Sequence, residues 1–266
     1  MSVGLTEIVA ATRRRLVNKR RAADVRALER QASEHTPRGF RQALVEAAAK
    51  GVAIIAELKK ASPSKGLIRA SFDPAALARE LEEGGAAALS VLTEEEFFQG
   101  SLQNLQFASE GTSLPCLRKD FIVEEVQITE ARANRADAIL LIVAALEQAE
   151  LQRLAAHARE QQLDVLCEAH DEDELRRALD AGCDLIGVNS RDLRTFHVDL
   201  NTAFRVAKKF PPGILAVAES GIHAASDIAE LRSAGYEAFL IGESLMKAAF
   251  PGSALRRLLG AAVSAE

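Results

Sequence analysis

Glu57 and Lys59 are the residues whose types and spacing point most directly to chemistry. They end an apolar, β-branched run that covers residues 52–58. Side chains two residues apart on a β-strand point to the same face, so both charges are expected on one side. Burying two charges is costly unless they are paired or take part in a reaction. A hydroxyl-rich turn, Ser62-Pro63-Ser64-Lys65-Gly66, follows at once. This pattern is typical of an α/β enzyme that presents its site at strand ends.

Polar residues also follow the later apolar runs of the chain. They are Lys119, Glu168, Asn189, Arg191, Glu219 and Ser220. Together with the first pair, they give a balance of carboxylates and cations. A pair of charges 4 Å apart gains about 4 kcal/mol at an effective dielectric constant of about 20. We expect such neighbours to separate the pKa values of the acids and bases, and a close cation to lower a lysine's pKa toward a range useful for proton donation.

The elements that must position these residues alternate along the chain. Strand-like runs are expected at 52–58, 87–92, 115–119, 138–143, 165–168, 185–188, 215–219 and 238–241. Amphipathic helical patterns lie between them, for example at 73–83, 124–134, 147–161, 171–181 and 224–233. Eight strands alternating with helices predict a single (β/α)₈ TIM barrel of the α/β class, whose site stands at the C-terminal strand ends. An open doubly wound sheet is the alternative, but the Gly-x-Gly-x-x-Gly turn usual after its first strand is absent.

The first 45 residues precede the first predicted strand. Leu5, Ile8, Leu16 and Leu28 give this segment a partial apolar stripe. We therefore predict an N-terminal helical extension, residues 1–45, that packs on a barrel formed by residues 46–266.

Two glycine-bearing loops indicate where an anion would bind. Ser220-Gly221 follows the seventh strand, and Gly242-Glu243-Ser244 follows the eighth. In such barrels these loops commonly hold phosphate through backbone N–H groups, and glycine permits a close approach. Aromatic residues that follow other strands would add apolar walls; they are Phe97, Phe98, Phe121 and Phe196. The predicted ligand is an aromatic ring joined to a phosphorylated chain.

Composition excludes several other classes of protein. The chain has 266 residues, 48% of them apolar, and a net charge of −5, so no overall positive charge would attract nucleic acid. The basic clusters at 13–15 and 19–21 lie among acidic residues, which indicates a solvated helix face rather than an RNA-binding arm or a transit peptide. No apolar run reaches membrane-spanning length. Cys116, Cys167 and Cys183 form no C-x-x-C pair and are expected to be reduced core residues of a cytoplasmic protein.

Five motifs at the predicted strand ends resemble the indole-3-glycerol phosphate synthase family of tryptophan biosynthesis. The most specific is residues 55–64, Ile-Ala-Glu-Leu-Lys-Lys-Ala-Ser-Pro-Ser. The others lie at residues 90–94, 117–121, 187–193 and 218–222, so the resemblance covers nearly the whole chain. Ordered motifs at so many strand ends are far more specific than one short motif.

The resemblance implies a (β/α)₈ barrel and a carbon–carbon lyase that needs no cofactor and no metal. It would convert 1-(2-carboxyphenylamino)-1-deoxyribulose 5-phosphate to indole-3-glycerol phosphate, with release of CO₂ and water. The protein would be a monomer or a weak homodimer, with a small phosphorylated molecule as its partner and neither nucleic acid nor membrane. The implied catalytic residues are Glu57, Lys59, Lys119, Glu168, Asn189, Glu219 and Ser220. The implied substrate-binding residues are Ser62, Pro63, Phe98, Phe121, Arg191, Leu193, Gly221, Gly242 and Glu243.

The resemblance also implies individual roles. Lys119 would be the general acid at the ketone during ring closure, and Glu168 would transfer a proton in the dehydration. Glu57 and Lys59 would position and polarise these groups, and which lysine acts at which step stays open. Arg191 would lie near the substrate carboxylate. Because a carboxylate cannot donate to phosphate, we expect the side chain of Glu243 to turn outward.

Three alternatives stay open at this point. A Schiff-base aldolase would also place lysines at strand ends, as Lys59 and Lys119 are placed. A sister barrel of the same pathway, the phosphoribosylanthranilate isomerase, shares the architecture but lacks the Glu-x-Lys start. A barrel that binds a phosphorylated metabolite without turnover is the non-enzymatic reading.

Overall fold

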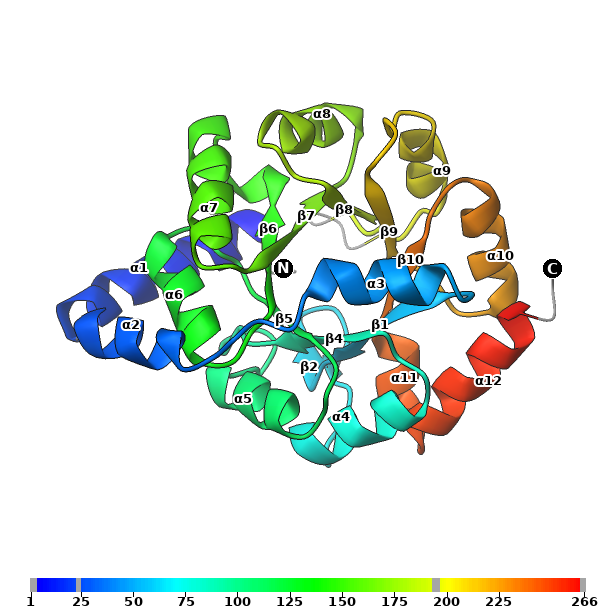
Figure 1. The fold of residues 1–266 in the computed structure, drawn as a ribbon, viewed down its shortest axis with the longest axis horizontal. Coiled ribbons are helices and arrows are strands. Elements are labelled where there is room, and N and C mark those ends of the chain that lie inside the picture. Colours follow the sequence, from blue (N-terminus) through cyan, green and yellow to red (C-terminus); the bar gives the residue numbers. More distant parts are fainter. Residues whose placement is uncertain (1–3, 23–24, 193–196, 264–266) are drawn as a thin grey trace.

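In the computed structural model, which describes residues 4–22, 25–192 and 197–263, a closed barrel of parallel strands forms the centre of the molecule (Figure 1). Within these residues the barrel strands are β1 (Ala53–Leu58), β4 (Ala88–Leu92), β5 (Cys116–Lys119), β6 (Ala138–Ile142), β7 (Asp164–Ala169), β8 (Leu185–Asn189), β9 (Leu215–Glu219) and β10 (Ala238–Ile241). Each pairs with the next in this order, and β10 pairs with β1. The predicted (β/α)₈ barrel is confirmed.

Helices surround the barrel on its outer side (Figure 1). They are α4 (Pro74–Glu83), α5 (Leu102–Glu110), α6 (Glu125–Ala133), α7 (Gln148–Glu160), α8 (Glu172–Asp180), α9 (Asn201–Ala207), α10 (Ala225–Ser233), α11 (Glu243–Lys247) and α12 (Pro251–Val263), with a 3₁₀ turn η1 (Val143–Ala145) after β6. Side-chain caps begin several of these helices, for example α4 and α8. Asp73 accepts from two backbone N–H groups at the start of α4, and Asp171 accepts from one at the start of α8.

The interior of the barrel is built in layers. Alternate strands β1, β5, β7 and β9 contribute one buried apolar layer; it consists of Ile55, Leu117, Leu166 and Val217. Two residues further along the same strands stand Glu57, Lys119, Glu168 and Glu219. Since side chains two apart share a face, the charged set forms the next layer toward the C-terminal ends. The barrel therefore places its apolar core directly beneath a layer of charges.

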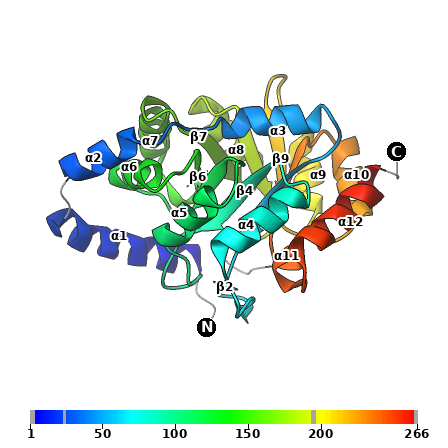
Figure 2. The ribbon, with the colours of Figure 1, turned by 60° about the horizontal axis from the view of Figure 1, so that its bottom comes forward.

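The N-terminal segment packs on the barrel at both of its ends. It contains α1 (Leu5–Ala22), α2 (Val25–Ser33) and α3 (Phe40–Ala48). Phe40 and Leu44 of α3 are fully buried against residues that begin the strands, so α3 closes that end. Helix α1 lies on the opposite side, the side of the loop after β1 (Figure 2). The predicted division of the chain after residue 45 falls inside α3.

A short hairpin follows β1. It consists of β2 (Ala61–Ser62) and β3 (Gly66–Leu67), which pair in antiparallel register. Arg69, just beyond it, donates from Nη1 to the carbonyls of Met246 at 3.1 Å and Ala248 at 2.9 Å. The hairpin is thereby tied to the end of α11, so the loops of the first and last strands are joined.

Two further expectations can be compared with the structure. All three cysteines are buried and free, as predicted for core residues. Among the helices of the described residues, none is both long enough and apolar enough to cross a membrane.

Candidate active site

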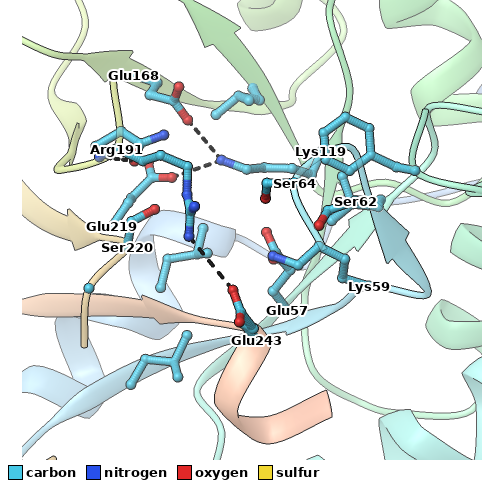
Figure 3. A pocket seen from close by; sticks show the side chains of 18 of the residues that line it. Glu57, Lys59, Ser62, Ser64, Lys119, Glu168, Arg191, Glu219, Ser220 and Glu243 are labelled. Atoms are coloured by element: carbon cyan, nitrogen blue, oxygen red, sulfur yellow. Dashed lines mark hydrogen bonds and ion pairs between the residues drawn. The ribbon is translucent and has the colours of Figure 1, made fainter. Parts of the chain in front are cut away.

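One pocket at the C-terminal strand ends gathers the predicted site residues (Figure 3). Its lining includes Glu57, Lys59, Ser62, Pro63, Phe98, Lys119, Phe121, Glu168, Asn189, Arg191, Glu219, Ser220, Gly221, Gly242 and Glu243. Leu193 and Phe196 lie outside the described residues. The predicted site residues come from separate strands and loops. The barrel brings those of them that the structure describes together in one pocket.

Lys119 is the centre of the charged layer. Its Nζ lies 2.8 Å from Glu168 Oε2 and 2.8 Å from Glu219 Oε2. The side chain of Lys119 is 12% exposed, and each carboxylate is 2% exposed. Figure 3 shows the ammonium group between the two carboxylates. Charges that are buried in this way must be paired, because burial removes their hydration and the attraction of an opposite charge compensates for that loss.

The pKa of Lys119 is raised, not lowered. Burial alone would lower this pKa, but the charges of Glu168, Glu219 and Glu57 outweigh it. The expectation that a neighbouring cation lowers the pKa of a lysine in this site is therefore wrong for Lys119, because its nearest charged partners are carboxylates. Lys119 is held as an ammonium ion and is a strong hydrogen-bond donor for an oxygen that gains negative charge.

The two carboxylates beside Lys119 have opposite pKa shifts. Burial raises the pKa of Glu219 to about 7, since the attraction of Lys119 is offset by the repulsion of Glu168. Burial also opposes ionisation of Glu168, but Lys119, His170 and a hydrogen bond from Asn189 lower its pKa to about 2. Two identical side chains thus supply an ionised base and a group that holds a proton near neutral pH. This separation of pKa values was expected, but its assignment to the two residues was not.

Glu57 and Lys59 form an ion pair with each other, as their spacing predicts. The pair lies at the end of β1, beside Gly242, which directly follows the neighbouring strand β10. A Cβ at Gly242 would lie 2.9 Å from Glu57 Cβ. Glycine at position 242 is therefore required by the close approach of the Glu57 side chain.

The backbone turns sharply at the end of β9. Ser220 has a φ of 65° and Gly221 a φ of 78°, so two successive residues are left-handed. A side chain at Gly221 would lie 2.8 Å from Val198 Cγ1. Strained backbone of this kind concentrates at functional sites. The turn aims the Ser220 hydroxyl and the following loop toward the pocket.

Two aromatic rings form one wall of the pocket. The ring centroids of Phe98 and Phe121 are 6.1 Å apart, with planes tilted by 39°. The buried carboxylate of Glu94 holds the loop of Phe98, because it accepts from the backbone N–H of Phe97 at 2.7 Å and of Phe98 at 3.2 Å. Arg15 of α1 pairs with Glu94 at 3.2 Å. Phe97 itself packs on the core and does not line the pocket.

Glu243 differs from its expected orientation. Its carboxylate lines the pocket mouth, where it lies 3.7 Å from Arg191 Nη2, 4.0 Å from Lys65 Nζ and 2.6 Å from Lys247 Nζ. Figure 3 shows it reaching toward Arg191. The expectation that this side chain turns outward is wrong in this structure. Three cations gather around it and provide the attraction that favours this orientation.

Two residues that the sequence did not single out belong to the same surroundings. His170 Nε2 lies 3.5 Å from Glu168 Oε1, and Asp120 lines the pocket beside Lys119. The signal for His170 was present, since it follows Glu168 by two residues and so shares its face. No three His, Cys, Asp or Glu side chains cluster as metal ligands in the part of the chain that the structure describes.

The fold and the site together define a (β/α)₈ barrel whose pocket at the C-terminal strand ends is lined by lysines and carboxylates. A model of the family described as indole-3-glycerol phosphate synthase matches residues 5–258. The chain belongs to this family.

Individual relatives agree with this assignment. The indole-3-glycerol phosphate synthase of Koribacter versatilis is 61% identical over 260 residues, which cover 98% of this chain and all of the relative. That of Desulfotalea psychrophila is 50% identical and covers 84% of this chain and 85% of its own. Among solved structures, a thiamine phosphate pyrophosphorylase from Pyrococcus furiosus has a TM-score of 0.61 at 16% identity, covering 81% of this chain and 96% of its own. The last likeness concerns the fold alone.

Proposed function

We propose that the protein is an indole-3-glycerol phosphate synthase. It converts 1-(2-carboxyphenylamino)-1-deoxyribulose 5-phosphate to indole-3-glycerol phosphate, and releases CO₂ and water. The family and the full-length relatives at up to 61% identity support this activity. The single observation in the site that carries the proposal is the buried Lys119 ammonium between Glu168 and Glu219, at the floor of a pocket with an aromatic wall.

Ring closure requires the aromatic carbon to be pressed against the ketone carbon. The proposed ring site is formed by Phe98 and Phe121, with Leu193 as a further member. The proposed phosphate site is formed by Ser62, Gly221 and Gly242 across the pocket. Anchoring both ends of one flexible molecule removes much of the entropic barrier to closure. Pro63 shapes the rim beside Ser62, and Arg191 binds the substrate carboxylate.

Lys119 is the proposed general acid of ring closure. The ketone oxygen gains negative charge as the carbon–carbon bond forms, and a preorganised ammonium group stabilises that charge. Loss of CO₂ then restores the aromatic ring. Dehydration needs a base and an acid, for which Glu168 and a lysine are suited. Glu57 and Lys59 orient these groups, Lys59 is the second candidate donor, and Asn189, Glu219 and Ser220 line the reacting centre.

The test is a fluorescence assay for indole-3-glycerol phosphate in EDTA. Wild-type protein is expected to form product, and Lys119→Ala to lose at least about 100-fold in kcat, the magnitude typical of a preorganised oxyanion partner. Lys209→Ala, at an exposed lysine paired with Glu172 at 3.8 Å, serves as the matched control and keeps full activity. A flat wild-type trace with demonstrated substrate binding would overturn the proposal in favour of a binding barrel.

Pre-steady-state kinetics separate the two lysines. Lys119→Ala is expected to slow ring closure itself, whereas Lys59→Ala is expected to act mainly on a later step. Ring closure at the wild-type rate in Lys119→Ala would refute the role given to Lys119.

The aldolase alternative finds no support in the site. A Schiff base requires a neutral amine, but the pKa of Lys119 is raised by the carboxylates around it, which outweigh the effect of burial. Borohydride in the presence of substrate is expected to leave the protein mass unchanged; a stable adduct would revive the alternative.

We further propose a cytoplasmic protein that is a monomer or a weak homodimer and acts without cofactor or metal. Sedimentation velocity across a range of concentrations tests the oligomeric state. A tight oligomer at low concentration would contradict it.

A further inference from the structure

His170 lies just beyond β7 and faces two carboxylates. Its Nε2 is 3.5 Å from Glu168 Oε1, and its Nδ1 is 3.0 Å from Glu174 Oε2. Its backbone N–H donates to the same Glu174 oxygen at 2.8 Å. The ring does not line the pocket and is 15% exposed. Any effect of His170 on the reaction must therefore pass through Glu168.

Glu174 is itself fixed in place. It stands in the first turn of α8, where its backbone N–H donates to the capping residue Asp171 at 2.8 Å. This bond fixes the backbone of Glu174. The Glu174 carboxylate in turn contacts both the backbone N–H and the ring of His170, and so clamps the two together.

The two contacts of the ring favour its charged form. A neutral imidazole that donates from Nδ1 to Glu174 would point the lone pair of Nε2 at the Glu168 carboxylate, whereas an imidazolium places an N–H there instead. At 3.5 Å this second contact is an ion pair and not a hydrogen bond, and Nε2 is a buried atom without a hydrogen-bond partner. The groups that face the ring come from three elements: Glu168 of β7, Glu174 of α8 and Glu219 of β9. Burial alone would lower the pKa of His170, but these carboxylates raise it.

Glu168 consequently has a separate cation at each oxygen. Lys119 lies on Oε2 and His170 on Oε1. We propose that His170 is a positioning residue: as an imidazolium clamped by Glu174, it holds the ionised Glu168 carboxylate aimed at the reacting centre. The catalytic consequence rests on the proposed synthase function, whereas the contact itself does not.

The contact is tested without turnover by NMR titration of the His170 imidazole nitrogens. In the wild type the midpoint is expected above 6.5, the ordinary value. In Glu168→Gln and in Glu174→Gln it is expected to fall toward 6.5, because each variant removes a carboxylate that favours the charged ring. An unchanged midpoint in Glu168→Gln would overturn the inference. A wild-type protein without synthase activity would overturn the proposed function and leave this titration interpretable.

The effect on the reaction is tested with His170→Gln, which keeps a donor but carries no charge. Its kcat at pH 7 is expected to fall about tenfold, because Glu168 stays ionised beside Lys119 but is no longer held in position, with KM within about twofold. The loss of kcat that the wild type shows as the pH rises through the His170 midpoint is expected to be absent. His157→Gln, at a histidine of α7 whose Nδ1 lies 3.4 Å from Glu160, is the matched control and keeps the wild-type profile. Wild-type kcat with a wild-type pH profile in His170→Gln would overturn the inference.

A second variant covers the case in which His170→Gln does not fold. In Glu174→Gln, the pH at which kcat falls on the alkaline side is expected to be lower than in the wild type. The difference should equal the change in the His170 titration midpoint measured by NMR. A shift in the titration without any shift in kcat would show that the contact is structural only, and would overturn the positioning role.

Discussion

At the scale of single residues, environment decides what each charged side chain does. Glu168 and Glu219 are chemically identical and bind the same ammonium group, yet burial and mutual repulsion separate their pKa values. The alternation of a strand was sufficient to predict that Glu57 and Lys59 share a face. It could not predict how charges from different strands pair, because pairing depends on the register and closure of the barrel. The orientation of Glu243 was missed for the same reason, since its cations come from three separate segments.

Glu219→Gln is expected to change how stability depends on pH. The pKa of Glu219 is higher in the folded protein than its ordinary value of 4.5. Its protonated form therefore contributes stability that is complete below pH 4.5 and is lost as the pH rises through about 7. Glutamine cannot ionise, so between pH 5 and pH 8 the variant should gain roughly 1–3 kcal/mol of unfolding free energy relative to the wild type. Urea unfolding at pH 5 and pH 8 measures the difference in unfolding free energy between the variant and the wild type. The same difference at both pH values would contradict the prediction.

Gly242→Ala is expected to damage the site through Glu57. The added methyl group would press on the Glu57 side chain and force it or the backbone to move. Overpacking of this kind costs about 1–3 kcal/mol, and displacement of the Glu57–Lys59 pair should lower kcat at least tenfold. Gly260→Ala is the matched control, because a Cβ there meets nothing within 4 Å and lies in α12. It should be neutral or stabilising by up to about 1 kcal/mol.

At the scale of elements, the N-terminal helices are part of the working structure. The apolar stripe predicted that they pack on the barrel, but not that α1 and α3 occupy opposite ends. That arrangement depends on contacts distant in sequence, such as the pair of Arg15 with the buried Glu94. Helix α1 thereby supports the loop that carries Phe98.

Arg15→Ala is expected to weaken substrate binding. Without its cation, the buried Glu94 carboxylate holds the backbone of the Phe98 loop less firmly, so KM should rise about threefold to tenfold with a smaller change in kcat. Arg13→Ala, in the same helix, removes a more exposed pair with Glu150 and should leave both constants unchanged. Steady-state kinetics measure KM and kcat for the two variants. Equal changes in both variants would show that the effect comes from α1 as a whole and not from the Arg15–Glu94 pair.

Asp137→Asn is expected to loosen the segment between α2 and α3. The Asp137 side chain is fully buried and accepts from Arg38 Nη2 at 2.6 Å, His35 Nε2 at 3.2 Å and the Cys116 backbone N–H at 2.6 Å. Loss of the charge leaves the Arg38 guanidinium without its buried carboxylate partner, at a cost of about 3–5 kcal/mol. Asp173→Asn, at an exposed pair with Arg176, should cost less than about 0.5 kcal/mol. Chemical denaturation gives the unfolding free energy of each variant. A similar loss of stability in both would show that Asp137 does not hold the segment between α2 and α3 in place.

At the scale of the whole molecule, periodicity predicted the barrel and its mouth correctly because each strand carries its own signal. The strand runs and their polar ends are local patterns, and barrel closure then follows from the repeated strand–helix unit. The details that sequence could not supply are long-range: the helix that closes the bottom, and the tie from Arg69 to the end of α11.

Ligand binding is expected to stabilise the barrel globally. The pocket is lined by residues from each of the eight barrel strands, so a bound molecule contacts strands from all around the barrel. A substrate analogue with its ketone reduced, at 100 times its Kd, should add about 2.7 kcal/mol to the free energy of unfolding. Hydrogen exchange should slow in every barrel strand. Protection confined to the loops would show that binding and global unfolding are uncoupled.

The layered interior of the barrel has a consequence for the balance between stability and activity. Glu57, Lys119, Glu168 and Glu219 occupy positions that barrels ordinarily fill with branched apolar side chains, such as the layer directly beneath them. Replacing a buried ionic group by apolar residues of similar volume is often neutral or stabilising. A few substitutions of these four residues by apolar ones would thus be expected to give a more stable protein without activity. The charged layer is therefore explained by the proposed reaction and not by the stability of the fold.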